Sequence, residues 1–164
     1  MPGPLDRLRD WLTRTPPQPP QPCVTPAQTP PPGVADIEGL LAFLPRLYPG
    51  GVAIDPFQNA PAEQWPVYVQ DVDAFFQAAG QECWIDYRYG DANPGDMLEH
   101  PEQIAQASLE QIKSLLTWCV RGERFCYGHH GAVIQNGAVL AILQRLQVIR
   151  NSLDHQAPHP RNRP

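Results

Sequence analysis

Two apolar patterns with helical spacing, joined by a glycine-marked turn, constrain the fold of this chain most. The first starts at Ser108, which forms a capping box with Gln111 because each side chain satisfies a free backbone N–H at a helix start. Its apolar positions recur every three or four residues: Ile112, Leu115, Leu116, Cys119 and Val120. The second pattern has the same spacing: Val139, Ile142, Leu143, Leu146 and Ile149. Each pattern predicts a helix with one buried face.

Shorter patterns upstream predict further helices. Asp36 is the expected N-cap of one helix, whose apolar positions are Ile37, Leu40, Leu41 and Leu44. Another is expected to have Pro66 in its first turn and to end at Gly80, burying Val69, Val72, Phe75, Phe76 and Ala79. Residues 101–107 predict a helix, either separate from the one at Ser108 or continuous with it. Residues 51–57 and 83–89 fit a short strand or a packed turn. The fold class predicted is mostly α: a compact bundle of four to six helices with at most a minor β-hairpin.

Composition divides the 164 residues into a domain and flanking segments. Nine of the 21 prolines fall within residues 16–33. Because proline fixes φ and removes a backbone donor, we expect residues 15–34 to be a disordered linker rich in polyproline II. Residues 35–150 are expected to form a single helical domain, long enough to bury a core without disulfides. The apolar pattern fails after Ile149, so residues 151–164 are predicted to be a disordered tail.

Charge and hydropathy exclude some classes of protein. The net charge is −5, and non-specific nucleic-acid binding depends on neutralising phosphates, so a nucleic-acid partner is not expected. Asp6 and Asp10 interrupt the region where a secretory signal would need an apolar run. The longest uninterrupted apolar run, residues 138–143, is too short to cross a bilayer. These features favour a soluble cytoplasmic protein with reduced thiols and no membrane partner.

The N-terminal residues 1–14 form a short amphipathic segment. Its apolar positions, Leu5, Leu8, Trp11 and Leu12, can lie on one face of a helix. A helix of fewer than about 12 residues rarely persists alone in water. The segment therefore predicts a docking peptide that binds a protein partner or its own domain. The alternative is a frayed terminus.

The turn between the two long helical patterns gathers the groups able to do chemistry. Gly128 is expected to break the chain, so that His129 opens a new helix with free N–H groups. Arg121 and Arg124 beside that helix start would then bind a phosphate or carboxylate. In that hypothesis His129 is an acid or base, and Asp86 orients it. The structural alternative is that both arginines complement a helix dipole and pair with Asp86.

The cysteines suggest neither a metal nor a cofactor. Cys126 and His129 are three residues apart and are candidates for a nucleophile–base pair. However, Phe125 beside Cys126 favours burial of the thiol. The four cysteines, Cys23, Cys83, Cys119 and Cys126, contain no C-x-x-C pair of the kind that holds structural zinc.

The order of these features resembles a bacterial and archaeal family called domain of unknown function 6508. The motifs are W-I-D-Y from Trp84, A-S-L-E-x-I-x-x-L-L-T from Ala107, V-R-x-x-R-F-C-x-G-H from Val120, and a final helix containing I-L-x-R-L from Ile142. The similarity covers about residues 37–150 and implies a shared fold but no reaction. The family's recurring groups map onto Asp86, Arg121, Arg124, Phe125, Cys126, Gly128, His129, Arg145 and Leu146.

Two positions depart from the family pattern. Tyr127 stands where the family usually carries a glutamate, and His130 stands where an apolar residue is more usual. If that glutamate were a general base or a metal ligand, this chain would lack the function. Glu123 is not an obvious substitute.

The leading hypothesis is a non-catalytic interaction or regulatory module. Its two expected contact surfaces are the segment Leu5–Leu12 and a cleft around Arg121, Arg124 and His129. The alternative is a small enzyme or ligand-binding protein that acts on an anionic, phosphate-bearing substrate through the same three residues. The partner, the ligand and the oligomeric state are not determined by the sequence.

Overall fold

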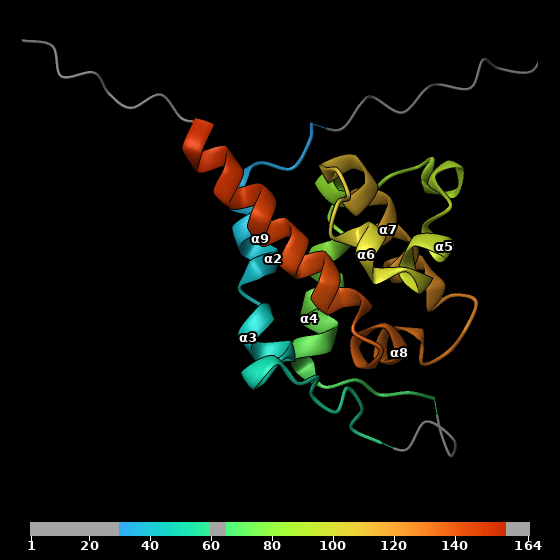
Figure 1. Ribbon diagram of the computed structural model, residues 1–164. Coiled ribbons are helices and arrows are strands. Elements are labelled where there is room, and N and C mark those ends of the chain that lie inside the picture. The colour runs from blue at the N-terminus through green and yellow to red at the C-terminus, as the bar shows by residue number, and fades with distance from the viewer. Residues whose placement is uncertain (1–29, 60–64, 157–164) are drawn as a thin grey trace, which may run out of the picture.

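Helix α9 (Ala138–Gln156) is the element against which much of the fold packs. The computed structural model describes residues 30–59 and 65–156. Along these ranges α9 contacts α2 (Val34–Leu41), α6 (Pro101–Ile104), α7 (Leu109–Gly122) and α8 (His129–Gln135), as Figure 1 shows. The remaining α-helices are α3 (Leu44–Leu47), α4 (Gln70–Ala79) and α5 (Pro94–Glu99). Three 3-10 turns complete the elements: η1 (Pro49–Gly51), η2 (Glu82–Trp84) and η3 (Tyr89–Ala92).

The predicted fold class is confirmed. The described residues form eight α-helices and no strand. The number exceeds the expected four to six because α3, α5 and α6 are helices of only one or two turns. An isolated antiparallel bridge joins Phe57 to Tyr68, which is the minor β pairing that the sequence allowed.

The core is made by the apolar faces predicted for α7 and α9. Side chains from both helices reach zero exposure: Ile112, Leu115, Leu116, Cys119, Val139, Ile142, Leu143 and Leu146. The face of α4 closes the core with Val72, Phe75, Phe76 and Ala79, all buried as predicted. Burial raises the pKa of the Cys119 thiol to about 12, so that this cysteine is a neutral packing group.

Several predicted boundaries were wrong by a few residues. Gly33 is the N-cap of α2, and Asp36 lies one turn inside the helix, where its carboxylate accepts the Gly33 N–H at 2.8 Å. Helix α4 begins at Gln70 rather than near Pro66, because Val69 is extended at the N-cap position. The capping box of Ser108 and Gln111 is present and separates α7 from α6.

The expected tail boundary also changes. Helix α9 continues through residues 151–156, beyond the predicted end of the domain at residue 150. Polar contacts sustain the helix there in the absence of an apolar pattern. Arg150 pairs with Asp154 one turn later, and it also pairs with Glu38 of α2 at 2.6 Å. The pair with Asp154 lies within α9, and the pair with Glu38 connects the end of α9 to α2.

No single helix in the described ranges is long and apolar enough to cross a membrane. The pair α8 and α9, which meet at 64°, reaches the required length and composition only when the two are taken together.

Two glycines in contrasting backbone conformations test this description. Gly39 lies inside α2, where an added Cβ would have nothing within 4 Å. Gly39→Ala should therefore stabilise the fold by roughly 0.5–1 kcal/mol, because glycine is the poorer helix former. Gly128 has φ +86°, so Gly128→Ala should destabilise it by roughly 1–2 kcal/mol. Urea unfolding of both variants measures the two opposite shifts; equal shifts would contradict these backbone assignments.

Candidate functional site

A six-residue loop, Glu123–Gly128, joins α7 to α8, and we call it the elbow. As predicted, Gly128 breaks the chain with a left-handed conformation and His129 opens the next helix. Backbone hydrogen bonds tighten the loop: the Cys126 N–H donates to the Gly122 carbonyl at 3.0 Å, and the His129 N–H donates to the Cys126 carbonyl at 3.1 Å. The elbow is thus a compact turn (Figure 1).

Glu123 organises the elbow. Its carboxylate accepts hydrogen bonds from the backbone N–H of Gly128 at 3.1 Å and of His130 at 2.9 Å. The Tyr68 hydroxyl, which comes from the segment before α4, donates to the same carboxylate at 2.8 Å. The N–H groups at the start of α8 were predicted to be free for an external anion. That prediction is wrong for His130, whose N–H donates to the chain's own carboxylate, and for His129, whose N–H donates to the Cys126 carbonyl.

The pKa of Glu123 reflects this environment. Partial burial alone would raise the pKa, but the three hydrogen-bond donors and the neighbouring His130 ring outweigh it and lower the pKa below its ordinary value. Burial, followed by the hydrogen bond to Glu123, raises the pKa of Tyr68 well above its usual range. The pair is therefore a carboxylate and a neutral phenol near pH 7.

His130 is packed against this pair. Its ring stacks on Phe76 with the centroids 3.7 Å apart and an interplanar angle of 7°. Its Nε2 lies 3.2 Å from the Val120 carbonyl oxygen, to which a neutral ring can donate. Burial lowers the pKa of His130 despite the nearby carboxylates of Glu123 and Asp73. His130 is therefore a largely buried, neutral imidazole near pH 7.

His129, the proposed acid or base, is also held by packing. Its ring meets Trp118 edge-on at 4.6 Å and lies so close to Gly122 that an added Cβ there would be 2.3 Å from the ring. Its Nε2 is buried and has no hydrogen-bond partner among the described residues. Burial, and then the charge of His130, lowers the pKa of His129. A ring nitrogen enclosed in this way is poorly placed to exchange a proton with a substrate.

The two arginines predicted to bind an anion have different surroundings. The Arg121 guanidinium lies over two aromatic rings, 5.8 Å from the centroid of Tyr87 and 5.2 Å from that of Tyr89. Arg124 is exposed. Within the described part of the chain, no hydrogen bond or ion pair joins Arg121, Arg124 and His129 to one another.

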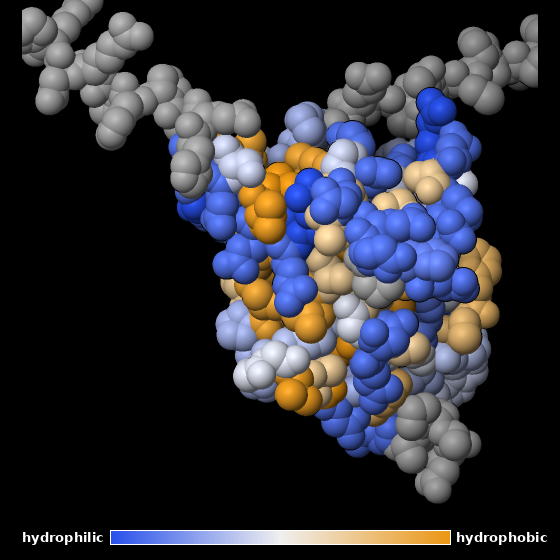
Figure 2. Space-filling model, in the orientation of Figure 1, coloured by the Kyte–Doolittle hydropathy of each residue, from blue (hydrophilic) through white to orange (hydrophobic). Residues whose placement is uncertain are grey.

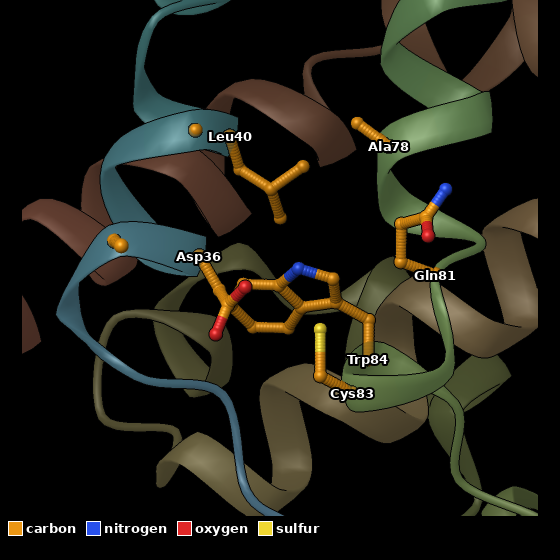
Figure 3. Close-up of a pocket in the computed structure, with 8 residues that line it drawn as sticks. Asp36, Leu40, Ala78, Gln81, Cys83 and Trp84 are labelled. Carbon is orange, nitrogen blue, oxygen red and sulfur yellow. The ribbon is translucent and has the colours of Figure 1, made fainter.

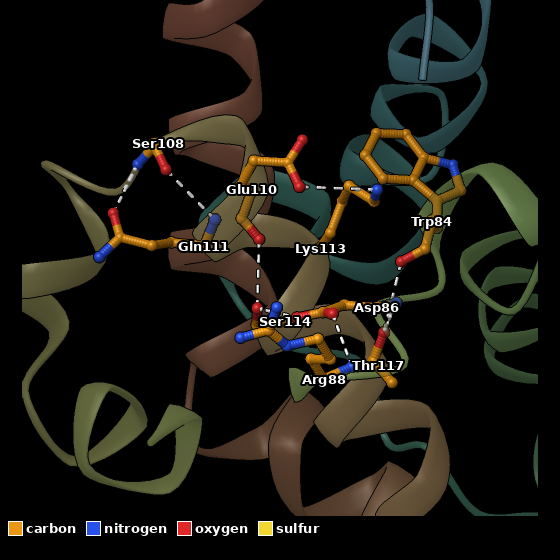
Figure 4. Close-up of polar contacts among 9 residues, drawn as sticks. All are labelled: Trp84, Asp86, Arg88, Ser108, Glu110, Gln111, Lys113, Ser114 and Thr117. Atoms are coloured by element: carbon orange, nitrogen blue, oxygen red, sulfur yellow. Dashed lines mark hydrogen bonds and ion pairs between the residues drawn. The ribbon is translucent and has the colours of Figure 1, made fainter. Parts of the chain in front are cut away.

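Asp86 serves a different purpose from the one predicted. Its carboxylate accepts hydrogen bonds from the Ser114 hydroxyl of α7 and from the Arg88 N–H (Figure 4). Its backbone N–H donates at 2.9 Å to Thr117 Oγ1, which lies 3.3 Å from the Trp84 carbonyl oxygen and can donate to it. Asp86 forms no ion pair within the described ranges, so the expected pairing with Arg121 and Arg124 is not found. These bonds fasten the loop after η2 to α7.

Cys126 is exposed, and so is Phe125 beside it, contrary to the expected burial. No hydrogen bond joins the Cys126 thiol to the His129 ring, so the nucleophile–base pair is not assembled among the described residues. No three His, Cys, Asp or Glu side chains of the described region gather as a metal site would require. The docking candidates Leu5, Leu8, Trp11 and Leu12 lie outside the described residues.

Two large aromatic side chains of the elbow are exposed, Phe125 and Tyr127, and a third, Trp65 from the segment before α4, contacts Tyr127; we call the three the aromatic surface. Phe125 is 84% exposed, Trp65 66% and Tyr127 65%. The rings of Trp65 and Tyr127 meet at nearly a right angle, with centroids 4.0 Å apart. The side chain of Asn59 fixes the backbone around Trp65, because it donates to the Trp65 carbonyl at 3.0 Å and accepts the Val67 N–H at 2.8 Å.

Two cavities are lined by other residues. One, of about 190 Å³, lies between α2 and η2 beside Asp36, Gln81, Cys83 and Trp84 (Figure 3). Burial, and then the neighbouring Asp36, raises the pKa of Cys83, so its thiol is protonated rather than a reactive thiolate. The other, of about 220 Å³, lies between α6 and α9. On the side of the molecule seen in Figure 2, apolar and hydrophilic residues are interspersed.

The family model described as a family of unknown function, DUF6508, matches residues 32–152. The chain belongs to this family. The match confirms the resemblance drawn from the motifs around Trp84, Val120 and Ile142. Comparisons with the curated proteins and with the solved structures gave no significant match. In this member of the family, Arg145 donates from Nε to the Ala107 carbonyl at 2.7 Å and so ties α9 to the start of α7.

Glu123 and Tyr68 are the site residues that sequence reasoning missed. One local signal was available: an acid directly after the last turn of a helix opposes the helix dipole, so Glu123 needed another reason to be there. Tyr68 gave no such signal, because it lies 55 residues away along the chain.

The role of Glu123 can be tested with a nearly isosteric substitution. Glu123→Gln keeps the size but presents an amide to donors that need an acceptor, and it should cost roughly 1–3 kcal/mol of unfolding free energy. Glu99→Gln is a matched control, since Glu99 is an exposed acid at the end of α5. Its effect should lie within about 0.5 kcal/mol of zero. Equal effects in urea unfolding would contradict the organising role of Glu123.

The same groups should make stability depend on pH. Because the fold lowers the pKa of His129 and His130 below 6.5, unfolding takes up protons, and acid favours the unfolded state. Stability should therefore be full above pH 6.5 and fall as the pH drops below it, with the Glu123 contribution lost at still lower pH. Calorimetry between about pH 8 and pH 5 measures this, and His130→Phe should flatten the profile. A melting temperature that rises on acidification would refute the assignment.

Proposed function

We propose that this chain is a non-catalytic interaction module, and that the aromatic surface of the elbow binds its protein partner. The observation that carries the proposal is the exposure of Phe125 and Tyr127 on the elbow, together with the exposed Trp65 ring that contacts Tyr127 from the segment before α4. Tryptophan, tyrosine and arginine dominate the binding energy of protein interfaces, and Arg124 lies exposed in the same loop.

Preorganisation supports the proposal. The Tyr127 backbone belongs to a loop held by Glu123, and the Trp65 backbone is held by Asn59. Side chains on such turns lose less conformational freedom when a partner binds, so more of the contact energy becomes affinity. The internal hydrogen bonds of the elbow thus serve to present the rings.

The anion-binding alternative has less support. It needs free N–H groups at the start of α8, but Glu123 binds two of them. It also needs His129 as an acid or base, but the His129 Nε2 is buried against Gly122. Of Arg121, Arg124 and His129, which this alternative needs at the surface, only Arg124 is exposed.

A pair of matched surface substitutions tests the proposal. Phe125→Ser removes an exposed ring from the aromatic surface, and Val52→Ser removes an apolar side chain that is 70% exposed on η1's C-terminal side. Both should leave the melting temperature nearly unchanged, as substitutions of exposed residues usually do. Each variant is used to capture partners, and mass spectrometry quantifies them. Other copies of this chain count as partners. We expect Phe125→Ser to capture at least tenfold less of one partner than Val52→Ser captures. Identical partner sets for the two variants would contradict the proposal.

A further inference from the structure

We propose that the aromatic surface is a proline-binding surface, and that it takes up the proline-rich segment 16–29 of a second copy of this chain. The inference rests on the interaction role proposed above and adds the chemistry and the source of the occupant. The two rings that carry it are Trp65 and Tyr127, which meet nearly at a right angle and are both about two-thirds exposed, and we call this pair of rings the wedge.

The chemistry of the wedge matches an extended proline-rich peptide. Proline rings are flat and apolar and pack against aromatic faces, and a polyproline II chain leaves its carbonyl groups without internal hydrogen bonds. The indole N–H of Trp65 and the hydroxyl of Tyr127 are donors, and neither bonds to another of the described residues. Rings that pack on proline and donors that reach its carbonyls are the two elements by which such peptides are recognised.

The chain carries a segment of this kind. Residues 16–29 contain six prolines and no charged residue. The surplus negative charge of residues 34–100 therefore neither attracts nor repels it. A proline-rich sequence also has less backbone entropy to lose on binding, because proline fixes φ.

The geometry favours a second copy as the source. The start of the described chain, drawn in blue, lies at the top of the domain in Figure 1, whereas the loop between α7 and α8 lies at the lower right. A domain of this size is about 35 Å across, given the usual scaling of radius of gyration with length. Fourteen residues of any chain reach at most about 50 Å, at roughly 3.6 Å per residue. Reaching its own elbow would use most of the segment as a tether and leave few prolines for the rings.

Complementation between two defective full-length chains tests the inference. One variant, Trp65→Ser with Tyr127→Ser, lacks the surface; the other, Pro17→Ser with Pro20→Ser, lacks prolines of the segment. Sedimentation velocity over a concentration series should show wild type and Val52→Ser dimerising, and each double variant monomeric. Mixing the two double variants should restore a weaker dimer, because one supplies an intact segment and the other an intact surface.

Other outcomes would overturn the inference and remain distinguishable from failure of the interaction role. A monomeric wild type removes the second copy as occupant, even if a synthetic peptide of residues 15–29 still binds. If only the surface variant fails to dimerise, the aromatic surface is an interface between copies but the proline-rich segment is not its occupant. A dimer that survives in both variants excludes the surface as the contact between copies. The interaction role itself fails only if Phe125→Ser retains every partner, this chain included.

Discussion

The elbow depends on one carboxylate that bridges three parts of the chain. Glu123 follows the last turn of α7, binds the first N–H groups of α8 and receives the hydroxyl of Tyr68 from the segment before α4. A carboxylate is unfavourable at the end of one helix and favourable at the start of the next. Because Glu123 lies at both, the second interaction and the Tyr68 hydrogen bond offset the first. The direction in which α8 leaves α7 follows from this arrangement.

The surroundings of the elbow show why nearby polar groups are not free to act on a substrate. His130 stacks on Phe76, His129 fills the space left by the missing side chain of Gly122, and Arg121 lies over two tyrosines. Asp86 is bound to hydroxyls of α7 instead of facing these groups. Four residues that looked in the sequence like parts of a site thus have packing or hydrogen-bond roles. The elbow leaves Arg124, Cys126 and its two aromatic rings exposed.

Much of the fold followed from the sequence because its information is local. The capping box at Ser108 and the apolar spacing through Leu116 act within a few residues, so they predict α7 correctly. Helix α9 was predicted for the same reason up to Ile149, but its last turns depend on Arg150 meeting Glu38, which is 112 residues away. The prediction of the site was wrong for the same reason, because its contacts join residues far apart in the sequence. Glu123 bonds to Tyr68, and Asp86 bonds to residues of α7. Patterns of spacing predict faces and ends, but they do not predict which distant donor meets which acceptor.

The aromatic surface and the bonds that shape the elbow come from different residues. Tyr127 lies in the same loop as the acid Glu123. Glu123 uses its carboxylate on backbone N–H groups, so a second carboxylate at position 127 would be a separate exposed charge. A tyrosine there instead contacts Trp65 and extends an apolar face. A ring rather than a charge at position 127 changes the exposed face of the elbow without changing how the elbow is built, because the bonds that shape it come from Glu123 and Gly128.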